Sequence, residues 1–332
     1  MSGFEENEVS KNAFGGTEIT KRSIAKNIPE ELANEFQVIP SRLEKIEDDK
    51  IRIYWAHDLA EDPICNHLGK EAGRAKFHKL VFSSNWQLNE FNVKLGVPLN
   101  DKVEVIETPI EPFQPEEINK SPDEVRLIYF STPQRGLEIL YPVVEKLVEK
   151  HPNIHLDVFS SFKIYGWEDA DKQFEPLYDK FRNHPNMTYH GFVHQDVLRE
   201  YVGKAHILAY PNVWKETSCR VLMESMSAGL LCVHPNLAAL PDTSGGLTSM
   251  YQYHEDRNEH ANLFYHYLDH AIEHVNKEDI QRYLQFVKAY ADNRFTITKI
   301  SQQWKNLMDG LLVKYPTVES RKPSQQILVF KT

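Results

Sequence analysis

The chain has 332 residues, which is the length of about two ordinary domains. It is 41% apolar and 26% charged, a globular mixture that excludes a collagen-like fibre, a coiled coil and wholesale disorder. Acidic residues outnumber basic ones by 48 to 38, and the resulting net charge of −10 disfavours a generally basic nucleic-acid-binding protein.

The acidic excess is concentrated at the start of the chain. Residues 1–117 contain 14 Lys and Arg against 22 Asp and Glu, and residues 118–332 contain the remaining 24 against 26. The change falls in a proline-rich stretch that is typical of a linker, with Pro109, Pro112, Pro115 and Pro122. The sequence therefore predicts domains at residues 1–117 and 118–310, followed by a tail at residues 311–332.

Cysteine usage and hydropathy indicate the compartment. Cys65, Cys219 and Cys232 cannot form a disulfide framework and include no CxxC pair, which favours a reducing cytoplasm. The polar, acidic N-terminus is not typical of a signal or transit peptide. No apolar run approaches the roughly 20 residues of a membrane span. We expect a cytoplasmic protein without a transmembrane segment.

Short apolar runs alternate with helical patterns along the chain. In the first domain, strands are predicted at residues 36–39, 51–56, 79–84 and 103–107, and helices at residues 17–28, 64–77 and 85–96. In the second, strands are predicted at residues 125–131, 154–160, 187–191, 206–211 and 230–235, and helices at residues 136–150, 172–183, 195–205 and 217–229. From about 258 to about 314 the pattern is helical.

This βα alternation implies an α/β fold with parallel sheets, helices on their faces and right-handed crossovers. We expect two Rossmann-like domains that face each other across a cleft. Ligands of such sheets bind beyond the carboxyl ends of the strands, so the cleft is the expected site.

The strongest local signal lies in residues 210–235. Glu216 precedes the helix predicted from residue 217, and Glu224 follows eight residues later, so the two carboxylates share one side. The N–H groups of Thr217, Ser218 and Cys219 are expected to open this helix, where they would suit a phosphate or sugar hydroxyls. The alternative is an ordinary amphipathic helix with a glutamate near its start.

This segment resembles the E-x7-E region of retaining GT-B glycosyltransferases, glycosyltransferase family 4. The residues that match the family pattern in order are Pro211, Glu216, Glu224, Met226, Ala228 and Gly229. Further segments with a resemblance, over residues 14 to about 246, are the glycine loop at 14–18, His57-Asp58 at a strand end, the strand and helix at 80–91, the hinge at 103–115, the strand and basic loop at 127–140, and residues 186–211.

The resemblance implies a GT-B enzyme that moves a hexose or similar sugar from a nucleotide diphosphate, with UDP or GDP expected, in a retaining reaction without a metal or further cofactor. It places the donor on Gly15, Gly16, Arg135, Glu216, Thr217, Ser218, Cys219 and Glu224. His57 and Glu216 are the implied catalytic residues. Arg135 and the helix starts would neutralise the leaving diphosphate.

Three departures and several alternatives accompany this prediction. A polar lead replaces the family's first strand, which predicts a truncated N-terminal domain. Arg135-Gly136 stands in place of a longer basic motif, and residues 108–110 replace the usual hinge.

The alternatives are an epimerase or phosphorylase-type enzyme of the same fold, and a non-catalytic sugar-nucleotide or glycan binding module. A glycan, a small metabolite and a modified nucleobase all stay open as acceptor, as does the oligomeric state.

Three other patterns have ordinary structural interpretations. Asp169 and Asp171 spell D-x-D, but their place before a predicted helix favours helix-start acids over metal ligands. The three histidines spaced by four residues from 266 to 274 share a helix face, where packing or solvation is expected rather than zinc. A basic patch at residues 74–79, near the cleft of the first domain, is expected to be solvated or to meet an anionic acceptor.

Overall fold

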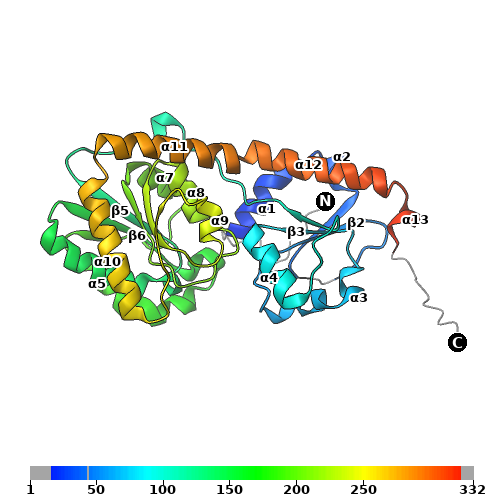
Figure 1. The fold of residues 1–332 in the computed structure, drawn as a ribbon, viewed down its shortest axis with the longest axis horizontal. Helices are drawn as coiled ribbons and strands as arrows, with labels where there is room; N and C mark the ends of the chain where they lie inside the picture. The colour runs from blue at the N-terminus through cyan, green and yellow to red at the C-terminus, as the bar shows by residue number, and fades with distance from the viewer. Residues whose placement is uncertain (1–15, 43–44, 323–332) are drawn as a thin grey trace. The chain divides into compact units, whose positions relative to one another are not determined.

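The computed structural model of the chain describes residues 16–42 and 45–322 (Figure 1). The described chain divides into two compact units. Unit 1 contains residues 21–107 and 300–322, and unit 2 contains residues 16–20 and 108–299. The sequence placed the first boundary later, at residue 117, and the second at residue 310.

Unit 1 is built on a parallel sheet whose described strands have the order β1-β2-β3-β4. The strands are β1 (Phe36–Pro40), β2 (Ile51–Trp55), β3 (Lys79–Phe82) and β4 (Val103–Val105). The neighbouring helices are α1 (Gly16–Asn27), α2 (Glu30–Ala33), α3 (Glu71–Arg74) and α4 (Asn85–Leu95). All five side chains of β2 are buried, as is typical of a parallel strand that is covered on both faces.

The single helix predicted at residues 64–77 is wrong. A 3-10 helix, η2 (Pro63–Gly69), is followed by the separate short helix α3, because Lys70 between them has an extended backbone. The two pieces pack tightly: a Cβ added at Gly73 would lie 1.8 Å from the carbonyl oxygen of His67. Only glycine allows this close approach of the two backbones.

Unit 2 is built on a six-stranded parallel sheet, in the described residues, with the order β10-β9-β8-β5-β6-β7. The strands are β5 (Val125–Phe130), β6 (Ile154–Phe159), β7 (Met187–Tyr189), β8 (Ile207–Ala209), β9 (Leu231–Pro235) and β10 (Ser249–Tyr251). The main helices are α5 (Leu137–Lys150), α6 (Glu175–Arg182), α7 (Gln195–Lys204), α8 (Arg220–Ser227), α9 (Leu240–Ser244), α10 (Arg257–His274) and α11 (Glu278–Phe295). The short strand β10 was not predicted.

The C-terminal segment belongs to unit 1, and the part predicted as a tail is packed on that unit as far as Lys322. Helix α12 (Ile297–Lys314) buries a stripe of side chains at Ile300, Trp304, Met308 and Leu311. The Trp304 ring lies 5.0 Å from that of Trp55 on β2. Beyond α12, helix α13 (Val318–Arg321) carries a buried guanidinium on Arg321 that pairs with Glu35 at 2.7 Å. The last two helices therefore complete the core of the N-terminal unit.

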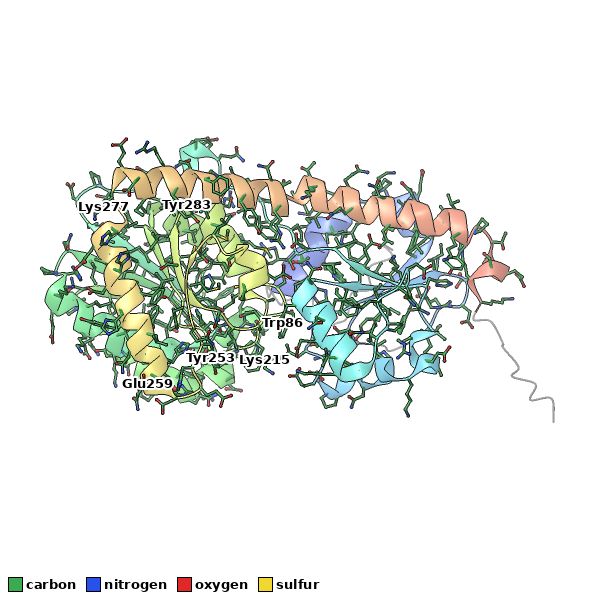
Figure 2. All side chains as sticks on the ribbon, viewed as in Figure 1. Trp86, Lys215, Tyr253, Glu259, Lys277 and Tyr283 are labelled. Carbon is green, nitrogen blue, oxygen red and sulfur yellow. The ribbon has the colours of Figure 1, made fainter. Side chains whose placement is uncertain are left out.

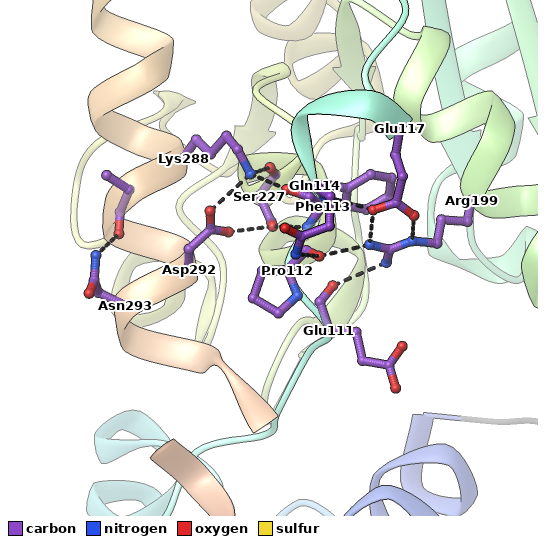
Figure 3. Close-up of polar contacts among 11 residues, drawn as sticks. Glu111, Pro112, Phe113, Gln114, Glu117, Arg199, Ser227, Lys288, Asp292 and Asn293 are labelled. Carbon is purple, nitrogen blue, oxygen red and sulfur yellow. Dashed lines mark hydrogen bonds and ion pairs between the residues drawn. The ribbon is translucent and has the colours of Figure 1, made fainter. Parts of the chain in front are cut away.

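The proline-rich segment after β4 is fixed to unit 2 by a network of polar contacts (Figure 3). The Arg199 guanidinium on α7 forms a bidentate pair with the Glu117 carboxylate and donates to the carbonyl of Pro112 at 2.8 Å. It also lies over the Phe113 ring at 3.8 Å. From the other side, Lys288 on α11 donates to the carbonyl of Phe113 at 2.5 Å. The segment predicted as a linker, residues 108–117, is thus ordered and packs against α7 and α11 within unit 2; we call it the strap.

We expect an Arg199→Met variant to lower the free energy of unfolding by about 2 kcal/mol at neutral pH, because several charge-assisted hydrogen bonds are lost together. The Arg199 hydrogen bonds hold the pKa of Glu117 at about 2, below its ordinary value of 4.5. The contribution of this pair is therefore complete above pH 4.5 and is lost as the pH falls toward 2. Denaturant titrations should show the two proteins converging over that range.

The control for this variant is Arg182→Met, which removes exposed ion pairs to Glu175 and Asp179. Exposed pairs contribute little, so a change within about 0.5 kcal/mol is expected. Equal effects of the two substitutions at neutral pH would show that the strap is not held as described.

Candidate functional site

The order in which the chain adds strands to the sheet of unit 2 reverses between β5 and β8. From β5 the chain proceeds outward through β6 and β7, then returns to β8 and proceeds outward on the other side through β9 and β10. The loops that leave the carboxyl ends of β5 and β8 therefore diverge at a topological switch point. In open α/β sheets this is where ligands bind.

The two diverging loops are in direct contact at Gly136. Its φ of +111° lies in the left-handed region, and a Cβ at this position would lie 2.1 Å from the carbonyl oxygen of Pro211. A side chain would force the two backbones apart. Glycine therefore allows the loop after β5 to hold Arg135 beside the loop after β8, which carries Glu216.

Arg135 and Glu216 form a largely buried ion pair. Arg135 Nη1 lies 2.7 Å from Glu216 Oε1, and the two side chains are 21% and 8% exposed. The Tyr210 hydroxyl donates to the same carboxylate oxygen at 2.9 Å. Burial by itself would lower the pKa of Arg135, but the neighbouring carboxylate outweighs it and raises that pKa. The guanidinium stays charged although its side chain is only 21% exposed.

Several polar atoms in the loops at this edge of the sheet are buried and, among the described residues, have no hydrogen-bond partner. They are Arg135 Nε, Thr132 Oγ1, Gln134 Oε1, Ser160 Oγ and Ser218 Oγ. All five residues follow the carboxyl ends of β5, β6 or β8. Buried polar groups in native proteins are nearly always hydrogen-bonded, so a group of unpaired ones at one edge of a sheet indicates a site for a polar ligand.

The helix after Glu216 begins later than predicted. The Met223 N–H donates to the Cys219 carbonyl at 3.1 Å, so Cys219 is the N-cap and α8 starts at Arg220. Thr217 and Ser218 lie in the preceding loop, and the prediction that they open the helix is wrong. They resemble N-cap residues, but the side chain of Asn212 holds the loop in a turn by accepting from Trp214 N–H at 3.0 Å. Figure 2 labels Lys215, which directly precedes Glu216 in this loop.

Glu224 lies on α8 and is paired with a cation. Its Oε1 lies 2.5 Å from Arg220 Nη2, and Arg220 Nη1 donates to the carbonyl of Pro109 at 3.0 Å. This links the second predicted carboxylate to the proline-rich strap. The two glutamates are therefore each held by an arginine, but only Glu216 lies among the unpaired polar atoms.

Of the predicted residues outside these loops, Gly15 lies outside the described residues and Gly16 is the first residue of α1. His57 follows β2 in unit 1. Its ring lies 4.3 Å from that of Trp55, and its backbone N–H donates to Ser41 Oγ at 2.8 Å. Burial, with a smaller contribution from the charge of Lys21, lowers the pKa of His57 to about 3. The imidazole is therefore neutral at pH 7.

Both carboxylates of the D-x-D pair have protein partners. Asp171 accepts hydrogen bonds from the Ser161 hydroxyl, the Phe162 N–H and the Tyr178 hydroxyl, and exposed Asp169 pairs with Lys172. Both carboxylates have structural partners, as expected, although they lie in a 3-10 helix, η6 (Glu168–Phe174), before α6.

Two of the three regularly spaced histidines of α10 pack against each other. The rings of His270 and His274 stack on each other at 4.0 Å. Within the described chain, metal-ligand spacing occurs instead at His151, Asp269 and Glu273. The ammonium of Lys150 already lies 2.7 Å and 2.8 Å from these two carboxylates, so a lysine occupies the place of a cation.

Four members of the site were not anticipated from sequence: Tyr210, Thr132, Gln134 and Ser160. Tyr210 is fully buried, and burial followed by the Glu216 charge raises its pKa well above the ordinary value, so it is a permanent hydrogen-bond donor. Its position at a strand end before Pro211 was a signal that could have identified it. Ser160 had no signal beyond following a strand.

The structure resembles solved glycosyltransferases over most of its length. A glycosyltransferase from Rickettsia africae matches with a TM-score of 0.65, covering 93% of this chain and 84% of its own, at 12% identity. Alr3699/HepE of Anabaena, solved in complex with UDP and glucose, matches with a TM-score of 0.59 over 89% and 76% of the two chains at 15% identity. Sucrose-phosphate synthase from Thermosynechococcus elongatus matches with a TM-score of 0.58 over 80% and 68% at 15% identity.

At such low identity these likenesses establish the fold. It is the GT-B class of two Rossmann-like domains, which confirms the predicted fold class. Residues 126–268 also match the family model of glycosyl transferases group 1. The matched segment lies in unit 2 and contains Arg135, Glu216 and Glu224. No curated protein matches the chain in sequence.

Two properties of the whole chain were also predicted. Cys65, Cys219 and Cys232 are buried free thiols, which confirms that they form no disulfide. No helix within residues 16–42 and 45–322 combines the length and the apolar character that a membrane span requires.

Proposed function

We propose that the chain is a retaining glycosyltransferase of family 4 that transfers a sugar from a nucleoside diphosphate donor, UDP or GDP, to a hydroxyl-bearing acceptor. The observation that carries this proposal is the buried Arg135–Glu216 pair with its surrounding unpaired donors and acceptors at the switch point of unit 2. The match to glycosyl transferases group 1 over the same loops supports it. The three free thiols support a reducing cytoplasm as its location.

In this proposal the residues of unit 2 bind the donor. Arg135 stabilises the charge that develops on the leaving diphosphate, with help from the loop N–H groups of Thr217, Ser218 and Cys219. Glu216 accepts hydrogen bonds from sugar hydroxyls, and Glu224 accepts from the ribose while it stays paired with Arg220. Gly15 and Gly16 keep the phosphate-facing role that the family resemblance gives them.

The reaction breaks the bond between the anomeric carbon and the diphosphate oxygen and forms a bond from that carbon to the acceptor oxygen on the same face. The acceptor proton goes to the leaving phosphate oxygen, so no protein nucleophile is needed. His57, which is neutral, donates or accepts a hydrogen bond at the acceptor or leaving oxygen. A fixed guanidinium supplies the positive charge that a metal supplies in other transferases, and the proposed reaction needs no metal or other cofactor.

Thermal shift measurements with UDP-, GDP- and ADP-glucose test the donor class. A nucleotide sugar at about 100 times its Kd stabilises the chain by about 2.7 kcal/mol, a shift of a few degrees. Release of the nucleoside diphosphate then measures turnover with candidate acceptors, and the anomeric configuration of the product tests retention. Inverted product would overturn the retaining mechanism, and loss of turnover with EDTA would overturn the metal-free one. Binding of a donor without turnover under any acceptor would point to the binding module.

A further inference from the structure

A pocket of about 740 Å³ lies in unit 1, at the edge of its sheet where the strands begin. This is the edge opposite to the carboxyl ends of the strands. The pocket is lined by residues at the amino-terminal ends of β2, β3 and β4, by one side of α12 and by residues as far as Lys322. Figure 1 labels β2, β3 and α12 among these elements. The volume is typical of small-molecule sites, but the edge is not the one that Rossmann-like sheets use for their ligands.

Three basic residues stand side by side at this edge because the strands are in parallel register. The His78 N–H donates to the Arg52 carbonyl at 2.8 Å, and the Leu80 N–H donates to the Lys102 carbonyl at 2.9 Å. Arg52, Lys79 and Lys102 therefore occupy neighbouring strand ends, and all three line the pocket. The basic patch at residues 74–79 was expected to be solvated or to meet an anionic acceptor near the cleft of the first domain. Two of its residues, His78 and Lys79, instead line this pocket at the amino-terminal edge of the sheet.

Two of these cations have no carboxylate within ion-pair distance among the described residues. Arg52 is 1% exposed and donates to four backbone carbonyls, including those of Lys76 and Arg321 at 2.6 Å and 2.8 Å, and its charge is offset only at longer range by Asp48. Half-buried Lys102 likewise lies within ion-pair distance of no carboxylate in the described part of the chain. Burial, followed by the charge of Arg74, lowers the pKa of Lys102. A buried cation that is not paired is costly, and an anionic ligand would remove that cost.

The remaining charges of the pocket are largely matched. Lys79 pairs with Glu104 at 2.8 Å and Lys314 lies 3.4 Å from Asp101, while Lys322 pairs with Glu319. Arg52 and Lys102, on which carboxylates such as Asp48 and Asp101 act only at longer range, are thus the two cations that a phosphate monoester dianion would pair with.

The rest of the lining fits the body of a polar molecule. The amides of Gln303 and Asn306 and the hydroxyl of Ser320 offer donors and acceptors for hydroxyl groups. The rings of Tyr315 and His78 pack edge to face at 4.5 Å and add aromatic surface to the lining. Burial, followed by the charge of Arg52, lowers the pKa of His78 to about 4, so this ring is neutral at pH 7.

We propose that this pocket binds a small, hydroxyl-bearing phosphate ester, with the phosphate held by Lys102 over Arg52. The site is separate from the proposed donor site, since all of its residues belong to unit 1 and to the amino-terminal edge of that sheet. Its occupancy does not depend on sugar transfer, so the two proposals can fail independently.

Isothermal titration of the full chain with glucose 6-phosphate, inorganic phosphate and glucose tests the proposal. Glucose 6-phosphate is expected to bind most tightly and glucose not at all. Lys102→Gln should weaken the binding at least tenfold. The matched control is Lys305→Gln, which removes an ammonium from the same helix as Asn306 but outside the pocket, where it pairs with Asp309 at 2.6 Å. It should leave the affinity unchanged.

Location is checked by amine acetylation and mass spectrometry, in which glucose 6-phosphate should protect Lys102 and leave Lys305 reactive. If Lys102→Gln does not fold, Lys314→Gln provides a second variant, with an expected loss of about threefold. No binding of glucose 6-phosphate at millimolar concentration, or binding that Arg135→Met abolishes and Lys102→Gln does not, would overturn the site. Inorganic phosphate binding as tightly as the ester would overturn the hydroxyl-bearing ligand.

Discussion

An Arg135→Met variant is expected to lose donor turnover by a factor of about 10² to 10³ in kcat/KM, which corresponds to about 3 to 4 kcal/mol of transition-state stabilisation. The guanidinium is fixed by Glu216 at 2.7 Å, and its Nε is buried without a partner among the described residues. A preorganised cation of this kind stabilises developing charge without rearrangement. The measurement is release of nucleoside diphosphate from the donor that stabilises the chain most.

The same substitution also removes a structural ion pair, so stability must be separated from activity. Arg126→Met is the matched control, because Arg126 on β5 pairs with buried Asp157 at 2.9 Å and lies far from the carboxyl end of that strand. Both variants are expected to unfold more easily than the native chain. Only Arg135→Met should lose turnover while folded. Turnover within threefold of the native value in folded Arg135→Met would refute the assigned role of this arginine.

The sequence predicted most of the fold because buried parallel strands are continuous apolar runs. Strands such as Val125–Phe130 and Ile154–Phe159 were found within a residue of their ends. Boundaries failed where local signals were ambiguous. Thr217 and Ser218 have the side chains of N-caps, yet α8 starts at Arg220, since the first helical hydrogen bond is to Cys219.

Contacts between residues far apart in the chain could not be predicted from the sequence. The buried Arg321 pairs with Glu35, a partner 286 positions away, and no local pattern distinguishes it from the exposed charges around it. The same holds for the site. Arg135 and Glu216 were each identified by resemblance, but their ion pair and the unpaired Ser160 hydroxyl follow from the strand order. The topology places β5 between β8 and β6, and this strand order cannot be predicted from a single amino-acid sequence.

Gly136→Ala is the second substitution with a large expected effect. The left-handed φ of +111° and the 2.1 Å approach of a Cβ to the Pro211 carbonyl oxygen both oppose a side chain. The expected loss in the free energy of unfolding is about 3 kcal/mol or more, since backbone rather than a flexible side chain must move. Separating the loops by about 1 Å would also displace Arg135 from its position beside Glu216, and misplacement of that size lowers turnover about 10²-fold.

Gly166→Ala is the control for Gly136→Ala, because the difference between the two variants gives the steric part of the effect. Gly166 has a φ of +75° and no atom within 4 Å of an added Cβ, so its substitution carries only the conformational cost of about 1 kcal/mol. Denaturant titration of both variants, with nucleoside diphosphate release as the second readout, compares them directly. If Gly136→Ala were as mild as Gly166→Ala in stability and kept full turnover, the loops after β5 and β8 would not be in contact. The switch-point site would then lose its basis, because that contact is what brings the guanidinium of one loop to the carboxylate of the other.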